Sequence, residues 1–169
     1  IECIGTGEYY GFTLNNNNRY LLSNFIVTHN TKFVRALGNA LDLPFNQISL
    51  GGMNDPSILV GHDSTYIGSK PGKIYETIVK SKCMNNVLFL DEIDKIGIMG
   101  TDKFTQMSGI LTHLFDKEQN SEFHDNYIGD IPIDVSKMFM IVSFNNKDNI
   151  DPIVLNRLKV VDVKENTIE

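Results

Sequence analysis

The feature that most constrains this chain is a continuous apolar run, Val87–Leu90, that is followed at once by two acids, Asp91 and Glu92. An unbroken apolar run of this length is typical of a strand in a parallel sheet whose two faces are both covered by helices. Such sheets bind ligands at the carboxyl ends of their strands. The run therefore places two carboxylates at a candidate binding edge. The alternative is a buried strand that ends in a solvated acidic turn.

Apolar spacing along the rest of the chain predicts helices and strands in alternation. Helices are expected where apolar residues recur three or four positions apart, and strands where apolar residues are continuous. A further short helix is expected near Pro152. The expected helices lie near residues 33–41, 74–79 and 104–115, and the expected strands are Phe45–Leu50, a second buried strand at Met138–Phe144 and a possible edge strand at Val160–Val163. This alternation predicts an α/β fold with a parallel sheet and flanking helices.

Residues 1–30 have a different character from residues 31–169, and we expect a domain boundary between them. Two runs rich in aromatic and β-branched residues, Tyr9–Leu14 and Arg19–Val27, are separated by four consecutive asparagines. Because asparagine tolerates the left-handed conformations of tight turns, these runs predict a β-hairpin. The chain begins at Ile1 rather than Met, so we expect it to be a piece of a longer protein.

Charge and composition exclude several classes of function. The net charge is -6, so the basic surface of a nucleic-acid-binding protein is not indicated. No apolar run approaches the roughly 20 residues of a membrane-spanning helix. Two cysteines are too few for a disulfide framework or a metal cluster, which favours a reducing intracellular compartment. We expect the cytoplasm first, with an organelle or a virus-infected host cell as alternatives.

The acid pair has the form of a Walker B motif, one half of a site for ATP and Mg²⁺. In that role Asp91 holds Mg²⁺, usually through water, and Glu92 polarises the water that attacks the γ-phosphate. The other half is a phosphate-binding loop of the form Gly-x-x-x-x-Gly-Lys-Ser/Thr. That loop is absent from the sequence. Thr31 nevertheless opens a predicted helix, as the last residue of such a loop would, and is a second candidate ligand of Mg²⁺.

Two further polar residues fit a nucleotide site. Asn145 follows the predicted strand Met138–Phe144 and could orient the attacking water; the alternative is an ordinary turn at the end of a strand. Arg157 follows the short helix near Pro152 and could reach the γ-phosphate of a neighbouring subunit as an arginine finger. The alternative for Arg157 is a surface salt bridge.

Residues 31–169 closely resemble the large AAA+ subdomain of Lon proteases. The segments that carry the resemblance are residues 48–55, 61–62, 65–74, 90–96, 116–121, 123 and 125–127. The resemblance implies that Asp91 and Glu92 are the Walker B acids, Asn145 is sensor 1 and Arg157 is a finger that acts in trans. It implies ATP and Mg²⁺ as cofactors, a homo-oligomeric ring, expected to be a hexamer, and unfolded or damaged proteins as substrates.

The resemblance also implies a substrate-gripping pore loop, in which Tyr66 and Ile67 line the axial pore of the ring. For Tyr66 taken alone, simple packing is the alternative. Lon's small helical subdomain and its peptidase dyad would lie beyond Glu169, so no proteolytic residue is assigned in this sequence. An AAA+ remodeller without peptidase activity is the alternative for the function of the whole protein.

Residues 1–30 do not belong to Lon but resemble the carboxyl-terminal splicing segment of an intein (Hint-type). The matching stretches are residues 10–14, 17–22 and 25–30. In splicing, the Thr31 hydroxyl attacks the upstream ester as a nucleophile. The Asn30 side chain then cyclises onto its own carbonyl and breaks the bond to Thr31, with general acid–base help from His29. An ordinary turn before a helix is the alternative for these three residues.

The place of this junction explains why the phosphate-binding loop is absent. An intein inserted between the lysine and the threonine of that loop would separate the glycines from Thr31 in the precursor. Thr31 would first be the splicing nucleophile and then a ligand of Mg²⁺. A misassembled join of two genes is the alternative, which the upstream reading frame would decide. In either case we expect no ATP hydrolysis from this stretch alone and an exposed edge on its sheet.

Overall fold

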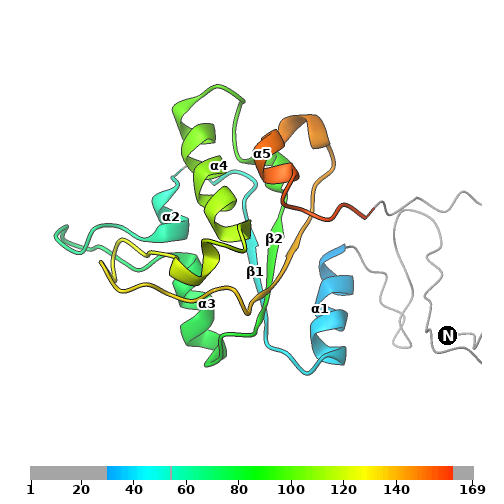
Figure 1. The fold of residues 1–169 in the computed structure, drawn as a ribbon, viewed down its shortest axis with the longest axis horizontal. Helices are drawn as coiled ribbons and strands as arrows, with labels where there is room; N and C mark the ends of the chain where they lie inside the picture. Colours follow the sequence, from blue (N-terminus) through cyan, green and yellow to red (C-terminus); the bar gives the residue numbers. More distant parts are fainter. Residues whose placement is uncertain (1–29, 54, 162–169) are drawn as a thin grey trace, which may run out of the picture. The chain divides into compact units, whose positions relative to one another are not determined.

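The structure is a computed structural model that describes residues 30–53 and 55–161 (Figure 1). Val34–Lys159 form one compact unit, and the described residues that flank it, 30–33 and 160–161, belong to a second. The predicted hairpin of Tyr9–Leu14 and Arg19–Val27 lies outside the described residues, as does His29. The fold described below is therefore that of the predicted ATPase part.

Three parallel strands form the sheet, in the order β1, β2, β3: β1 is Phe45–Ser49, β2 is Val87–Asp91 and β3 is Phe139–Val142. The register pairs Ser49 with Asp91 and Leu90 with Val142. The carboxyl ends of all three strands therefore meet at one edge. This confirms the predicted α/β fold with a parallel sheet.

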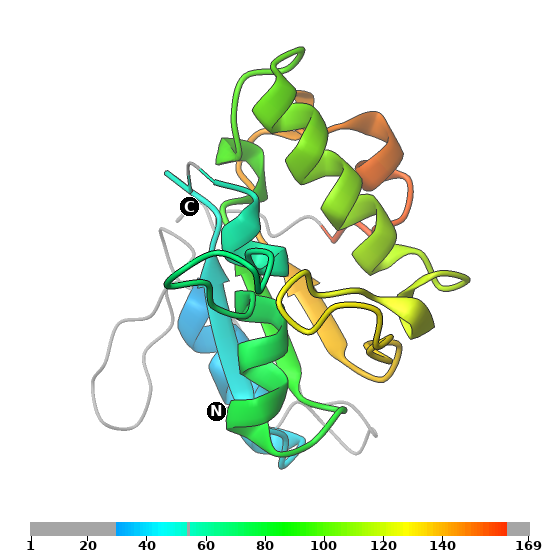
Figure 2. The same ribbon diagram turned by 90° about the vertical axis from the view of Figure 1, so that its left-hand side faces the viewer.

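Helices connect and flank the strands, as the apolar spacing predicts. They are α1 (Asn30–Ala40), α2 (Ser57–Val60), α3 (Lys73–Ser81), α4 (Asp102–Phe115) and α5 (Pro152–Leu155), with short 3-10 turns η1 (Ile93–Lys95), η2 (Asn120–Glu122) and η3 (Lys147–Asn149). The Thr101 side chain caps α4 by accepting from the Phe104 N–H, and Asp151 caps α5 in the same way. Figure 2 shows α4 beside α5 on one side of the strands. None of the described helices is long and apolar enough to cross a membrane.

Side chains of β2 are buried on both faces of the sheet, which accounts for its unbroken apolar run. Leu88 and Leu90 belong to the larger core, which includes residues of α2, α3, α4 and α5. Val87 and Phe89 pack on the other face, against Val34 of α1. Burial of these side chains contributes roughly 1.5–3 kcal/mol each. The core thus holds the strand that carries the acid pair firmly in place.

The third strand differs from its prediction. The sequence predicts a buried strand at Met138–Phe144, but β3 spans only Phe139–Val142, where Phe139 is 44% exposed and the other residues are half-buried. The reason is that, among the described strands, β3 pairs with β2 alone and so has one open edge. Likewise no strand includes Val160 or Val161, and the rest of the stretch predicted as Val160–Val163 lies outside the described residues.

Candidate functional site

Asp91 is the last residue of β2 and is held from both neighbouring strands. Its carboxylate accepts hydrogen bonds from the Ser143 hydroxyl, just beyond β3, and from the Gln47 amide of β1, the latter at 3.1 Å. The side chain of Asp91 is half-buried. It is therefore fixed at the carboxyl edge of the sheet, where the sequence predicts it, and remains reachable from solvent.

Glu92 makes the chain turn sharply away from the sheet. It has a left-handed backbone, with φ 60° and ψ 49°, a conformation that costs a non-glycine residue on the order of 1 kcal/mol. Its N–H donates to the Ser143 hydroxyl at 3.1 Å. Its carboxylate pairs with Lys95, and that hydrogen bond raises the pKa of Lys95 above its ordinary value. The two acids thus face different partners, although they are adjacent in sequence.

Ser143 is the residue that holds the two acids together, and sequence analysis did not single it out. Its hydroxyl donates to Asp91 and accepts from the Glu92 N–H. Its backbone continues the sheet, donating to the Leu90 carbonyl at 3.0 Å and accepting from the Ile93 N–H at 3.0 Å. The strand register contained the signal, because a residue one position past Val142 must lie beside the end of β2.

Asp94 anchors the segment that carries Asn145. It is only 5% exposed, and its carboxylate accepts a hydrogen bond from the Asn146 N–H at 3.2 Å. Asn145 itself is exposed, two residues beyond Ser143 at the same edge of the sheet. The structure therefore brings the predicted sensor residue to the same edge as Asp91 and Glu92.

Arg157 forms a salt bridge with Asp116, the alternative to a role as an arginine finger. Its Nε and Nη2 both donate to one oxygen of Asp116, at 3.3 and 3.0 Å, and its Nη1 donates to the Ile153 carbonyl at 3.0 Å. A hydrogen bond from the Glu118 N–H and the nearby guanidinium hold the pKa of Asp116 below its usual range. In the described residues, none of the Arg157 hydrogen bonds goes to Asp91 or Glu92.

The predicted pore loop connects α2 to α3 and exposes its aromatic–aliphatic pair. Tyr66 is 70% exposed and Ile67 is 107% exposed, the highest value among the large apolar side chains described. The tip is a tight turn, in which the Tyr66 N–H donates to the Asp63 carbonyl and the Ser69 N–H to the Tyr66 carbonyl. Among the described residues Tyr66 is not packed in the core, since its side chain lies mostly in solvent, and its part in a pore stays a prediction.

A polar cluster beside this loop has the residue types of a catalytic triad but not its geometry. Ser57 contacts Nε2 of His62 at 2.9 Å, and Asp55 approaches the same Nε2 at 3.5 Å. A triad needs the serine and the acid on opposite ring nitrogens. Hydrogen bonds from Ser57, more than His62, keep the pKa of Asp55 below its ordinary value. The cluster is an exposed polar turn rather than a hydrolytic site.

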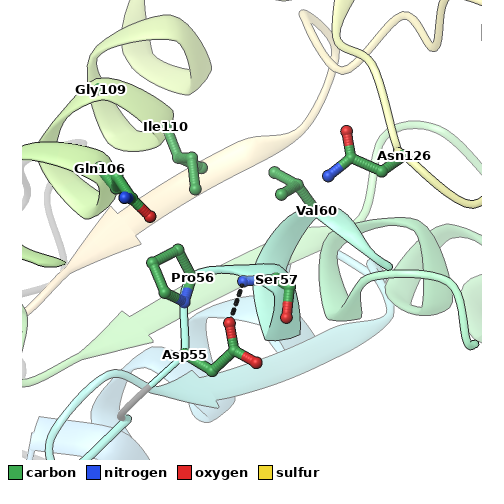
Figure 3. A pocket seen from close by; sticks show the side chains of 8 residues that line it. All are labelled: Asp55, Pro56, Ser57, Val60, Gln106, Gly109, Ile110 and Asn126. Atoms are coloured by element: carbon green, nitrogen blue, oxygen red, sulfur yellow. Dashed lines mark hydrogen bonds between the residues drawn. The ribbon is translucent and has the colours of Figure 1, made fainter. Parts of the chain in front are cut away.

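A surface pocket of about 480 Å³ lies between α2, α4 and Asn126 (Figure 3). Its lining mixes polar and aliphatic side chains and contains none of the predicted site residues. The residues that line the pocket are Asp55, Pro56, Ser57, Val60, Gln106, Gly109, Ile110 and Asn126. The pocket is therefore separate from the edge that carries Asp91 and Glu92.

The donor set at the sheet edge suits Mg²⁺ rather than a transition metal. Among the described residues, no group of three or more His, Cys, Asp or Glu side chains is placed to hold a metal ion. Mg²⁺ commonly keeps several waters and takes one or two carboxylates, so the half-buried carboxylate of Asp91 fits it. Thr31 lies in the first turn of α1, within the second unit, and its part in such a site stays a prediction.

A parallel sheet with an acid pair at the carboxyl end of its middle strand is an arrangement suited to nucleotide hydrolysis in α/β domains. The comparison with family models makes this specific. The chain belongs to the ATPase family associated with various cellular activities (AAA), whose model matches residues 28–165. Residues 1–27 lie outside that match.

The chain is also similar to Lon proteases. The chain is 41% identical over 132 residues to Lon protease of Elusimicrobium minutum, 40% over 131 residues to that of Nitrosococcus oceani, and 38% over 135 residues to the peroxisomal Lon protease homolog 2 of Caenorhabditis elegans. These alignments cover 78%, 78% and 79% of the chain but only 15%, 16% and 17% of the relatives. The chain thus corresponds to about a sixth of such a protein.

Proposed function

We propose that the chain is part of an ATP-dependent protease of the Lon type, in which ATP hydrolysis drives protein substrates through the pore of a homo-hexameric ring. The observation that carries this is the acid pair at the end of β2, held in a fixed arrangement by Ser143. The sequence similarity to Lon proteases supports the choice among AAA functions. An intracellular, first of all cytoplasmic, location goes with this proposal.

In this mechanism Glu92 is the general base, and the carboxylate of Asp91 lies on the side of the site where Mg²⁺ would bind. Mg²⁺, when bound with ATP, neutralises the charge that develops on the phosphates. Asp91, which Ser143 and Gln47 hold in place, would bind the ion through water. Glu92 accepts the proton of the attacking water, and Asn145 orients that water from the neighbouring strand end. Lys95 is paired with Glu92 in this state and must move away so that the attacking water can reach the base.

The exposed pair Tyr66 and Ile67 supplies the grip on the substrate. An aromatic and an aliphatic side chain on a tight turn contact an extended polypeptide through apolar surface, which is independent of its sequence. This suits unfolded or damaged proteins as substrates. Six copies of the loop around an axial pore would pass such a chain along as each subunit hydrolyses ATP.

Replacing Tyr66 by alanine tests the function of the loop. In the protein expressed from the complete reading frame, we expect Tyr66→Ala to lower ATP-driven degradation of unfolded casein by about 10-fold or more, because the grip is lost, and to leave basal ATP hydrolysis within about 2-fold. The matched control is Ile131→Ala, another exposed apolar side chain that lies outside the loop. Equal casein degradation by Tyr66→Ala and wild type would refute the pore-loop role.

The same assay separates the protease from the alternative, an AAA+ remodeller without peptidase activity. A Lon-type protease converts casein to small acid-soluble peptides in the presence of ATP. A remodeller leaves the casein chain intact but still unfolds a folded reporter protein. Formation of peptides therefore supports the first proposal, and unfolding without peptides supports the second.

We also propose that residues 1–30 are the carboxyl-terminal splicing segment of an intein. The support is the resemblance of this stretch, the His29-Asn30-Thr31 junction, and the position of Thr31 where the missing phosphate-binding loop would end. Asparagine suits this position because its side-chain amide can close a five-membered ring on its own carbonyl. Thr31 would then serve ATP binding once the intein is removed.

Replacing Asn30 by alanine tests the splicing proposal. In the protein expressed from the complete reading frame, intact-mass analysis should show a spliced product in which Thr31 follows upstream sequence. The Asn30→Ala variant should keep residues 1–30 attached, because alanine cannot cyclise. The control is Asn39→Ala, an exposed asparagine on α1 away from the junction. Residues 1–30 retained in the wild-type protein would argue against splicing.

Gly51 should be sensitive to a single added methyl group, because a Cβ at this position would collide with the Glu92 carboxylate. The collision is with the end of a flexible side chain, so Glu92 would rotate away rather than unfold the protein. We expect Gly51→Ala to lower ATP turnover by about 10-fold with little change in melting temperature. Gly109→Ala, at a position with open space, is the control. Unchanged turnover would show that the position of Glu92 seen here is not the catalytic one.

A further inference from the structure

Besides its backbone connections, the loop that carries Tyr66 and Ile67 is bound by a fully buried acid, Asp125, which is 0% exposed. One carboxylate oxygen of Asp125 accepts a hydrogen bond from the Gly72 N–H at 2.7 Å, where the loop enters α3. The other accepts from the N–H groups of Tyr127 and Ile128, at 3.0 and 3.4 Å. The carboxylate thus joins the end of the loop to a separate segment of the chain.

The next residue, Asn126, holds the beginning of the same loop. Its backbone N–H donates to the Val60 carbonyl at 2.7 Å, and its side-chain amide donates to the Gly61 carbonyl at 3.1 Å. The two stems are also joined directly, because the His62 N–H donates to the Lys70 carbonyl at 3.2 Å. Two consecutive residues therefore hold both ends of the loop.

The glycines at the two stems allow this close approach. Gly61 has φ +80°, and a Cβ there would come within 2.6 Å of the Asp125 carboxylate. A Cβ on Gly72 would collide with the Leu59 carbonyl. Both stems therefore need glycine, one for its positive φ and contact with Asp125, the other for contact with the backbone of α2.

The segment that carries Asp125 is itself firmly anchored. Phe123 and Ile133 exchange backbone hydrogen bonds of 3.1 and 2.8 Å as an antiparallel bridge, and the Phe123 side chain is in the core. The Val135 N–H donates to the Asn120 carbonyl at 2.9 Å, just after α4. A force on the loop is thus passed to the core and not only along the backbone into α2 and α3.

We propose that Asp125 and Asn126 are positioning residues that hold the Tyr66–Ile67 loop in a fixed orientation so that it can pull on a substrate. The inference rests on the proposed function of this loop. Among the described residues, the tip makes hydrogen bonds only within the turn, including those of Asp63, so the stems decide where it points. We call the hydrogen bonds of Asp125 and Asn126 to the two stems the clamp. Without the clamp the loop would still contact substrate but would yield when the substrate resists pulling.

The local test is amide hydrogen exchange of the loop in the protein expressed from its complete reading frame. Asp125→Asn places an NH₂ donor against at least one of the backbone N–H donors that the carboxylate now satisfies. We expect exchange in the peptide covering residues 61–72 to become about 10-fold faster, with peptides of β2 and α4 unchanged. Asn126→Ala removes the side-chain bond to the Gly61 carbonyl and should give a smaller increase in exchange. This variant replaces Asp125→Asn in the test if Asp125→Asn does not fold.

The matched control is Asp134→Asn. This acid lies in the same segment, and its hydrogen bonds within the described part of the chain come only from Ser136, so its replacement should leave exchange of the loop unchanged. Unchanged loop exchange in both Asp125→Asn and Asn126→Ala would overturn the proposal. So would an increase of the same size in the control or in β2, because it would show a general loss of stability.

The functional readout separates this proposal from that of the pore loop itself. With the clamp weakened, we expect basal ATP hydrolysis within about 2-fold of wild type but about 5- to 10-fold slower maximal degradation of a folded substrate, which must be pulled. The KM for unfolded casein should change much less. A faster-exchanging loop with undiminished degradation of the folded substrate would overturn the positioning role. If the Tyr66→Ala variant also degrades substrate at the wild-type rate, the proposed pore-loop function is wrong, even if the exchange data show that the clamp holds the loop.

Discussion

Replacing Glu92 by glutamine should stop ATP hydrolysis while leaving ATP binding nearly intact. Glutamine has the same shape and leaves the backbone bond to Ser143 in place, but its amide cannot accept a proton from water. A positioned general base contributes about 10²- to 10⁴-fold to a rate, so we expect turnover to fall by at least 100-fold. Binding should persist because Asp91 and its partners are untouched.

The measurement is single-turnover ATP hydrolysis together with binding of a fluorescent ATP analogue, using the protein expressed from the complete reading frame. Glu118→Gln, an exposed glutamate after α4, is the matched control and should behave as wild type. Turnover within 10-fold of wild type in Glu92→Gln would exclude Glu92 as the base. A loss of both turnover and binding would instead assign Glu92 to the binding of nucleotide.

The acid pair could be predicted from the sequence because its signal is local. An apolar run buried on both faces followed by two acids places Asp91 and Glu92 at the end of a strand, and the structure agrees. Ser143 was within reach of the same reasoning, since a parallel register aligns the residue after Val142 with the end of β2. What the sequence did not show is that one hydroxyl serves both acids.

The sequence predicts an exposed edge on the sheet but not that β3 lies at it, because strand order is not a local property. Phe139–Val142 is apolar whether one or two strands pair with it, and only the neighbour decides its burial. The role of Asp125 was hidden for a similar reason. It lies in an irregular polar stretch, where an acid is normally exposed, and its burial follows from the approach of Gly61 and Gly72, which are distant in sequence.

For Arg157 the sequence is compatible with an arginine finger and with a surface salt bridge, and the structure of one chain shows the salt bridge. The salt bridge to Asp116 forms within the single chain. A finger that acts in trans has its target on another subunit, so this contact is compatible with both roles. If Arg157 is the finger, Asp116 holds the guanidinium near the subunit surface until a neighbouring ATP site is present.

Replacing Arg157 by alanine should lower ATP turnover by about 10³-fold or more, the effect expected for removal of an arginine finger. Asp116→Asn should lower it far less, because the charge on the guanidinium remains, although its fixed position is weakened. If the arginine only stabilises the packing of α5 on α4, the two variants should instead show similar modest losses of melting temperature and similar activity. ATP turnover and thermal melting of both variants distinguish these outcomes.

Mixed rings decide whether Arg157 acts in trans. Glu92→Gln subunits and Arg157→Ala subunits should each be inactive alone. When the two are mixed, some interfaces pair an intact Glu92 with an intact Arg157 from the neighbour, so part of the ATP turnover should return. If the finger acts on its own subunit's site, no site in the mixture contains both residues and activity stays at background. Recovery on mixing would thus require that the arginine now bound to Asp116 serves the neighbouring subunit's ATP.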